Sequence, residues 1–185
     1  IIHQSNKKMK NFDQNLENIK DRANLAWTLM KLFEEEWNNL SPINQGTCSR
    51  TFYHQVWDAP KLHTGLISLE ATEIKKPTAD HWTVPQFTGY MILQHPDIFL
   101  VDKELFVKLF IFSCQCIWVT KDQNGALSKY TSKSEKTIKC TFNERYKKEN
   151  IQLFVKGGGR LDLDEYYNSL NPPAEYLEMQ QKYIA

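Results

Sequence analysis

Residues 116–129 read Cys-Ile-Trp-Val-Thr-Lys-Asp-Gln-Asn-Gly-Ala-Leu-Ser-Lys. The first five are rich in β-branched and aromatic side chains, which favours a short strand. Thr120 and Gln123 then stand at the spacing of a capping box, in which each side chain bonds the backbone of the other residue at a helix start. The stretch therefore predicts a strand that passes directly into a helix running through Leu127, with Asn124 in the first turn.

The rest of the chain mixes helical and extended patterns. Apolar residues at three- and four-residue spacing predict helices over Phe12–Asn38, from Pro85 towards Leu93, over Val101–Phe112 and after Asn171-Pro-Pro173. Strands are expected at Leu66–Ile74 and Ile151–Val155. Gly46, Pro60 and Gly65 predict an irregular packed stretch over residues 44–65. The fold class is therefore α+β.

Composition bounds the class of protein. The 185 residues include 41% hydrophobic side chains, 23 basic residues and 22 acidic ones, for a net charge of +1. These values exclude a disordered or collagen-like chain. The longest apolar stretches are far shorter than the roughly 20 residues that span a bilayer, so no membrane association is expected. The chain starts at Ile1 without a signal-peptide pattern, and we expect a portion of something longer or a trimmed chain.

The cysteine pattern indicates an intracellular protein. Cys114 and Cys116 are separated by a single residue. Cys48 and Cys140 are each far from any other cysteine in the sequence. A four-cysteine zinc site would show two pairs with two residues between the ligands, and a secreted disulfide framework would be denser in cysteine. We therefore expect reduced thiols and a cytoplasmic location.

The most informative polar residues are Asp80-His81 and Asn124. Asp80 and the Asn124 carbonyl are hard oxygen ligands of the kind that Mg²⁺ or Mn²⁺ takes, with waters and phosphate oxygens completing the shell. His81 projects to the other side of an extended backbone and is free to deprotonate a water near neutral pH. The start of a helix at Asn124 also favours a phosphate nearby. This set suits metal-assisted phosphodiester hydrolysis.

These residues resemble a family. Asp80-His81 with Pro85 downstream, followed by Val119-Thr-Lys-Asp-Gln-Asn124, is similar to the His-Me finger (ββα-metal, HNH) nucleases, in the Asp-His-Asn version of endonuclease VII and phage homing endonucleases. The resemblance implies metal ligands at Asp80 and Asn124 and a general base at His81. It also implies a double-stranded DNA substrate, and a bacterial or phage-infected cell as the source.

The resemblance also implies how the chain is organised. His81 and Asn124 are farther apart than in a compact hairpin, so the helical region 85–112 must be an insertion between the two halves of the core. Residues 66–132 would form a small ββα-metal nuclease core. Residues 1–65 would pack on this core as a helical and irregular region, and residues 133–185 would add a basic stretch and a C-terminal strand–helix extension. We expect one compact domain, as a monomer or homodimer.

A basic stretch follows the proposed metal helix. Residues 127–150 carry seven basic side chains against three acidic ones, with aromatic residues between them, a pattern typical of phosphate contacts. The expected DNA-binding residues are Lys75, Lys76, Lys129, Lys133, Lys136, Lys139, Arg145, Lys147 and Lys148. The near-zero total charge therefore reflects cancellation, because acidic residues gather elsewhere in the chain.

Two alternatives stay open at this point. Asp58 followed by Glu73-Ile-Lys75 resembles the PD-(D/E)xK nucleases, in which carboxylates hold the metal and a lysine supports the nucleophile. The chain could also be a non-catalytic DNA-binding module. Under the first alternative the protein is still a metal-dependent nuclease, with its site at Asp58, Glu73 and Lys75. Under the second it binds DNA without cleaving it.

Overall fold

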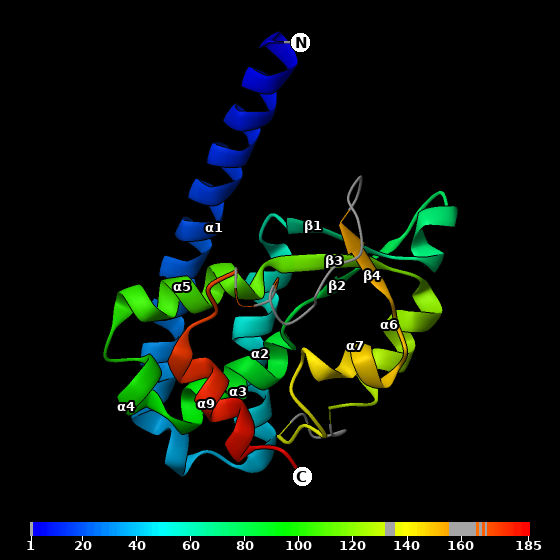
Figure 1. The fold of residues 1–185 in the computed structure, drawn as a ribbon. Helices are drawn as coiled ribbons and strands as arrows, with labels where there is room; N and C mark the ends of the chain where they lie inside the picture. Colours follow the sequence, from blue (N-terminus) through cyan, green and yellow to red (C-terminus); the bar gives the residue numbers. More distant parts are fainter. Residues whose placement is uncertain (1, 132–135, 156–165, 167, 169) are drawn as a thin grey trace.

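The structure is a computed structural model that describes residues 2–131, 136–155, 166, 168 and 170–185, with the course of the backbone alone for residues 2–13. Helices gather on one side of the molecule and a sheet on the other (Figure 1). The first turns of the N-terminal helix extend away from the body. The expected α+β class is confirmed.

The helical part is built mainly from long segments near the N-terminus and from the segment between two strands. It contains α1 (Ile2–Glu36), η1 (Trp37–Asn39), α2 (Pro42–Asp58), α3 (Pro85–Gln94), α4 (Pro96–Phe99), α5 (Lys103–Ser113) and α9 (Ala174–Lys182). α2 packs on α3, and α1 packs on both α2 and α5. None of the helices in the described ranges is long and apolar enough to span a bilayer.

The sheet has four strands in the order β2-β3-β1-β4. These are β1 (Leu62–Ser68), β2 (Thr78–His81), β3 (Gln115–Val119) and β4 (Leu153–Val155). β3 runs parallel to β1, and the other two pairs are antiparallel. The short helices η2 (Glu70–Glu73), α6 (Lys121–Ser128) and α7 (Glu144–Lys148) lie on the sheet side of the molecule (Figure 1).

The helical region expected over residues 85–112 lies between β2 and β3 in the sequence. β2 and β3 pair antiparallel, with Thr78 opposite Val119 and His81 opposite Cys116, although α3, α4 and α5 lie between them in the sequence. α6 begins two residues after β3 ends. The chain therefore places two antiparallel strands and a following helix next to one another, with the inserted helices joining the helical part.

The capping box that the sequence predicted at the start of α6 is confirmed. Thr120 Oγ1 accepts from the Gln123 backbone N–H at 3.1 Å, and Gln123 Oε1 accepts from the Thr120 N–H at 2.9 Å. The same Gln123 side chain accepts from Ser68 Oγ at 2.6 Å and donates to Glu70 at 2.7 Å. One residue thus starts the helix and attaches it to the end of β1.

Aromatic packing holds α1, α2 and α5 together. The Phe106 ring stands edge-on to Trp27 and Phe52, at centroid distances of 5.3 and 5.9 Å, and Phe52 also meets Phe110 at 5.4 Å. Such pairs contribute about 0.5–1.5 kcal/mol each beyond the area they bury. α2 and α3 approach so closely that a Cβ on Gly89 would collide with the Ser49 carbonyl. The helical part is therefore a tightly packed support for α2.

Two sequence-based expectations were wrong. Residues 44–65 are not irregular, because α2 occupies most of them. The helix is capped by Ser41 with Pro42 at its first position, and it buries Ser49, Phe52 and Val56 along one face. Gly46 and the polar Ser49 obscured that stripe in the sequence.

The strand expected over Leu66–Ile74 begins earlier and ends at Ser68. The Ser68 hydroxyl accepts from the Ala71 N–H at 3.2 Å. This local bond turns the chain into η2 instead of prolonging the ladder.

Candidate functional site

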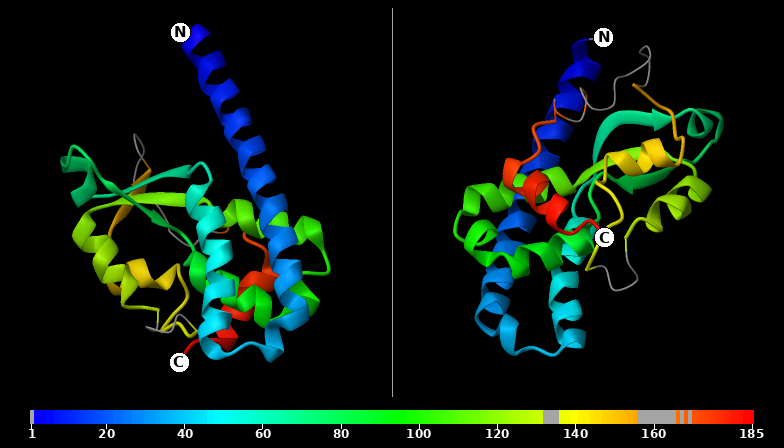
Figure 2. Two further views of the ribbon diagram at one scale, coloured as in Figure 1. Left: turned by 180° about the vertical axis from the view of Figure 1, so that it is seen from behind. Right: turned by 60° about the horizontal axis from the view of Figure 1, so that its bottom comes forward.

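One pocket of about 790 Å³ lies where the helical part meets the sheet. It is bordered by the C-terminal half of α2, by β2 and the turn after it, by α6 and by the segment leading into α7. The left view of Figure 2 shows α2 on one side of this region and α6 on the other. Asp80, His81 and Asn124, the three residues predicted for metal binding and catalysis, all line the pocket.

Asp80 is buried and held by two side chains of α7. Arg145 Nη2 donates to Asp80 Oδ2 at 2.7 Å, and the Tyr146 hydroxyl donates to the same oxygen. Arg145 Nη2 also donates to the His81 carbonyl at 2.6 Å. The other carboxylate oxygen, Oδ1, accepts no hydrogen bond from any described residue. Arg145 therefore fixes the end of β2 and leaves one oxygen of Asp80 available.

The charge states of Asp80 and Arg145 depend on one another. Burial raises the pKa of the Asp80 carboxyl, while Arg145 and the Tyr146 hydrogen bond oppose the rise. Burial acts to lower the pKa of Arg145, but Asp80 and Tyr146 raise it above its ordinary value. Because a guanidinium stays protonated in proteins, the carboxylate form of Asp80 compensates a buried positive charge.

His81 lies on the other side of β2 from the α7 contacts. Its ring meets the Trp57 ring of α2 edge to face, with centroids 6.0 Å apart. His81 is 9% exposed, and its Nε2 is buried without a hydrogen-bond partner among the described residues. Burial lowers the pKa of His81 to about 4, and the charges of Lys61 and Arg145 act in the same direction. The imidazole is therefore neutral at physiological pH, as a proton acceptor must be.

Asn124 enters the pocket from α6. It is partly buried, and its carboxamide forms no hydrogen bond with any described residue. Its neighbour Gln123 is the residue that fixes α6 through the capping box and the bonds to Ser68 and Glu70. The helix is thus anchored one position away from a side chain that is left available for a ligand.

Two residues of the pocket have a carboxylate or carboxamide oxygen that accepts no hydrogen bond from any described residue. No cluster of three His, Cys, Asp or Glu side chains that could hold an ion is found among the described residues. The available donors are Asp80 Oδ1 and the Asn124 carboxamide oxygen. Mg²⁺ commonly binds through one or two protein oxygens and completes its shell with water and phosphate. Two protein oxygens therefore fit Mg²⁺ or Mn²⁺, and they are too few for a metal that is enclosed by protein ligands alone.

Two of the expected DNA-binding lysines border the pocket. Lys129 and Lys139 line it, and both are exposed. Lys129 also forms an ion pair with Glu149 at 2.6 Å. Together with Arg145, they give the pocket three cationic side chains. Arg145 is paired with Asp80 and Lys129 with Glu149, so Lys139 is the lining cation that forms no ion pair with a described residue, and it leaves an excess of one positive charge. The pocket therefore favours an anionic ligand.

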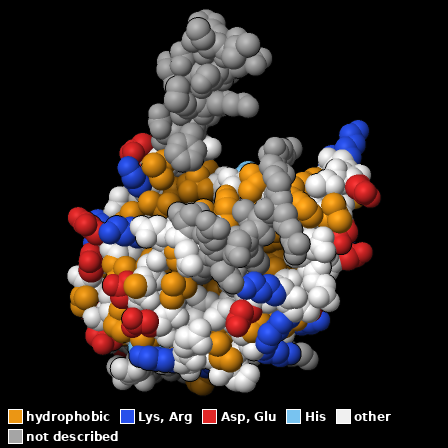
Figure 3. Space-filling model, in the orientation of Figure 1, with side chains coloured by type: hydrophobic (Ala, Val, Ile, Leu, Met, Phe, Trp, Pro, Cys, Tyr) orange, Lys and Arg blue, Asp and Glu red, His pale blue; other side chains and the backbone are white. Residues whose placement is uncertain are grey.

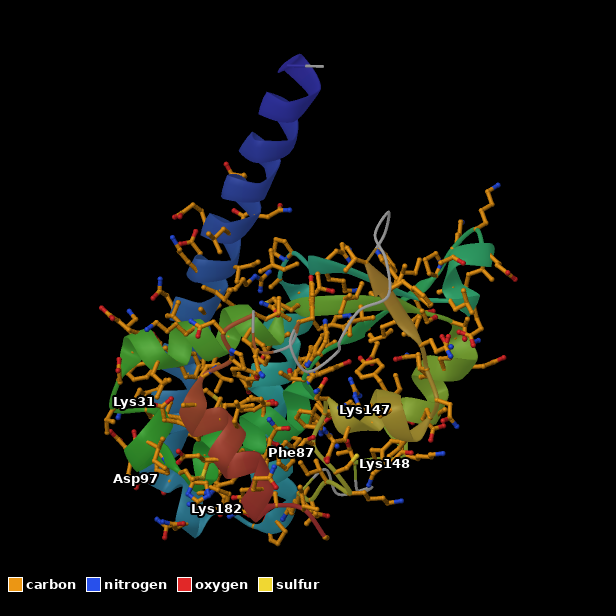
Figure 4. The ribbon with its side chains drawn as sticks, in the orientation of Figure 1. Lys31, Phe87, Asp97, Lys147, Lys148 and Lys182 are labelled. Atoms are coloured by element: carbon orange, nitrogen blue, oxygen red, sulfur yellow. The ribbon has the colours of Figure 1, made fainter. Side chains whose placement is uncertain are left out.

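Among the described residues, the other expected DNA-binding lysines do not line the pocket. Lys147 and Lys148 are exposed on α7, where Figure 4 shows them away from Lys31 and Lys182 on the helical part. Figure 3 shows basic side chains gathered over this region. Lys75 and Lys76 are exposed in the turn before β2, and Lys136 lies over the Tyr90 ring. Lys133 lies outside the described residues.

Arg145 differs from the sequence-based expectation. It was expected at the DNA surface, but its side chain is 3% exposed and paired with Asp80. A direct contact with bases would require it to leave this pair. Its position therefore indicates a structural link between α7 and β2.

The structure does not bring Asp58, Glu73 and Lys75 together. Asp58 ends α2 before β1, and Glu73 ends η2 after it. The seven residues of β1 separate the two ends by about 20 Å. Glu73 is the last residue of η2, and Ile74 and Lys75 follow it before β2 begins, so the Glu-x-Lys triplet does not lie on a strand. The arrangement needed for the PD-(D/E)xK alternative is therefore absent from this fold.

The sequence did not single out Tyr146, Trp57 or Lys61 as part of the site. Lys61 Nζ lies 4.8 Å from the centroid of the Trp57 ring. The sequence signal that could have found Trp57 is the pairing of Tyr53 and Trp57 one helical turn apart, because both line the pocket. Tyr146 follows Arg145 directly, but its contact with Asp80 spans 66 residues and leaves no local pattern.

Comparison of the chain with protein-family models, with curated proteins and with solved structures finds no match.

Proposed function

We propose that this protein is a Mg²⁺- or Mn²⁺-dependent DNA endonuclease of the phage homing type, with a ββα-metal core. The observation that carries the proposal is that Asp80, His81 and Asn124 line one pocket, although the sequence separates His81 from Asn124 by the whole helical insertion. A carboxylate, a neutral imidazole and a carboxamide in a pocket rich in cations suit hydrolysis of a phosphodiester.

Asp80 Oδ1 and the Asn124 carboxamide oxygen would hold the metal ion. When bound, the ion would act as a Lewis acid that stabilises the negative charge developing on the phosphate and on the departing 3′ oxygen. Arg145 and Tyr146 would stay on Asp80 Oδ2 and fix the direction in which Oδ1 points. The protein's part in metal binding is therefore to orient two oxygen atoms.

His81 would act as the general base. The neutral imidazole accepts a proton from the attacking water, whose oxygen forms a bond to phosphorus as the bond to the 3′ oxygen breaks. Burial is the main cause of the lowered pKa of His81, and the charges of Lys61 and Arg145 add to it, so the ring is held neutral. The products would carry 5′ phosphates and 3′ hydroxyls.

Lys129 and Lys139 would bind the DNA backbone beside the reacting phosphate. Lys147 and Lys148, which are exposed on α7 (Figure 4), would add further contacts with the backbone. These contacts hold the duplex without reading its sequence. Binding should therefore weaken as salt concentration rises.

Incubation with supercoiled plasmid tests the proposal. Mg²⁺ or Mn²⁺ should produce nicked or linear DNA, EDTA should stop the reaction, and a DNA ligase should reseal the nicks because they carry 5′ phosphates. Salt-dependent binding to duplex DNA with no cleavage in either metal would instead favour a non-catalytic DNA-binding module.

A further inference from the structure

Trp57 is a large aromatic side chain exposed beside the candidate base. It is 54% exposed, and it lines the pocket from the last turn of α2. Its ring is 6.0 Å from the His81 ring and 5.8 Å from that of Tyr53, which lies one turn earlier on the same helix and also lines the pocket. Lys61 places a positive charge over the indole. An aromatic surface with an adjacent cation therefore stands at the edge of the reaction site.

Trp57 is not part of the buried hydrophobic core. The core side of α2 is made by Phe52 and Val56, which are buried, whereas Trp57 faces solvent next to the pocket. Aromatic side chains beside a cation are the means by which proteins hold nucleobases, since every base has a π-face and a neighbouring phosphate. The indole of Trp57 beside the ammonium of Lys61 therefore points to a ligand that has a nucleobase and a phosphate.

We propose that Trp57 is a nucleobase-stacking subsite, so that the preferred substrate carries an unpaired nucleotide next to the phosphate that is cut. This inference rests on the proposed function for the identity of the reacting phosphate. The Trp57 and His81 rings meet edge to face with centroids 6.0 Å apart, so a base stacked on Trp57 would lie directly beside a phosphate at His81. A base on Trp57 and a phosphate at His81 therefore belong to the same or to adjacent nucleotides.

A perfectly paired duplex does not offer such a base. Each base in the stack is covered on both faces by its neighbours, and extruding one costs a few kcal/mol, with the lowest cost for a mismatched or unpaired base. Lys61 is placed to neutralise a phosphate of the displaced nucleotide when the base takes its position on the indole. Bulged, mismatched or single-stranded DNA should therefore bind better than duplex DNA of the same length.

The experiment compares binding of three labelled DNAs without metal. The first is a duplex with a one-nucleotide bulge, the second is the same duplex with an abasic bulge, and the third is fully paired. The proteins are wild type, Trp57→Ala, Trp57→Phe and the control Ile43→Ala, which changes an 82% exposed side chain on the same helix away from the pocket. Circular dichroism of each variant shows that it is folded.

Wild type should bind the bulge with a base between about 5-fold and about 150-fold more tightly than the abasic bulge, the range expected for stacking of one base on an aromatic ring. Trp57→Ala should abolish this difference, Trp57→Phe should keep part of it, and Ile43→Ala should keep all of it. Equal binding of the two bulges by wild type, or an undiminished difference in Trp57→Ala, would overturn the subsite.

The same DNAs with Mg²⁺ separate this inference from the proposed function. A Trp57-dependent preference for the base without any cleavage would support the subsite and reject the nuclease. Cleavage that depends on His81 but is equal on all three DNAs would reject the subsite and support the nuclease.

Discussion

Arg145 Nη2 lies 2.7 Å from Asp80 Oδ2, although the two residues are 65 positions apart in the chain. This ion pair is buried, and it joins α7 to the strand that also carries His81. The guanidinium therefore has two effects on the candidate site. It compensates the charge of Asp80, and it fixes the backbone from which the candidate base projects.

Removing Arg145 should strongly destabilise the protein. Arg145→Gln leaves the Asp80 carboxylate buried without its cation, and breaking such a pair costs about 3–5 kcal/mol of the free energy of unfolding. Urea denaturation measures this cost. The matched control is Arg22→Gln, because Arg22 pairs with Asp58 at 3.8 Å on the surface and its loss should cost at most about 1 kcal/mol. Equal losses in the two variants would show that the Asp80–Arg145 pair is not an important link.

His81 should make the stability fall in mild acid. The unfolded chain binds a proton on this histidine below about pH 6.5, whereas the native state does not until about pH 4. The unfolded state therefore binds more protons in this window, and the His81 contribution should drop by about 2 kcal/mol between pH 7 and pH 5. Urea titrations of wild type and His81→Asn at both pH values measure it.

The control for that pH dependence is His54→Asn, which changes an exposed histidine. The stability difference between wild type and His81→Asn should shift with pH by the stated amount. A constant difference across the window would mean that the native His81 ring titrates as it does in the unfolded chain.

Several features of the fold were predictable because their signals are local. The capping box of Thr120 and Gln123 lies within four residues, and it predicted both the start of α6 and the position of Asn124 on it. The apolar spacing of Val101–Phe112 likewise predicted α5, whose N-cap is Asp102. Asp80 and His81 were identifiable because a carboxylate and an imidazole are adjacent in the sequence.

The rest depended on contacts that the sequence does not display. α2 was missed because its buried face includes Ser49 and its length includes Gly46, so the apolar stripe is interrupted. Arg145 was assigned to the surface because it lies among lysines, but a partner 65 residues away buries it. Trp57 became part of the site only when the fold placed the end of α2 against β2.

Asn124 should matter for metal use and not for folding. Its carboxamide bonds no described residue, so Asn124→Ala should change the free energy of unfolding by no more than about 0.5 kcal/mol. The Mg²⁺ concentration for half-maximal cleavage should rise at least about tenfold. Asp122→Asn, at an exposed position in the first turn of the same helix, is the control and should not move it. An unchanged metal requirement in Asn124→Ala would remove Asn124 from the metal site.

Lys139 should contribute one phosphate contact. Lys139→Ala should reduce the slope of log Kd for duplex DNA against log salt concentration by about 1, because one fewer counterion is released on binding. Lys182→Ala changes a lysine on the helical part, as Figure 4 shows, and should leave the slope unchanged. Salt titrations of binding without metal give both values, and equal slopes for wild type and Lys139→Ala would place the DNA elsewhere.

The most direct test of the central claim is the single-turnover rate of Mg²⁺-dependent DNA cleavage by wild type and His81→Ala, measured beside their DNA affinities. A general base typically contributes a factor of about 10²–10⁴ to the rate. The predicted result is a loss of rate of that size in His81→Ala. The DNA affinity should stay within about twofold of wild type, a change much smaller than the loss of rate. Cleavage at the wild-type rate by a folded His81→Ala variant would contradict the assignment of this pocket as the catalytic site.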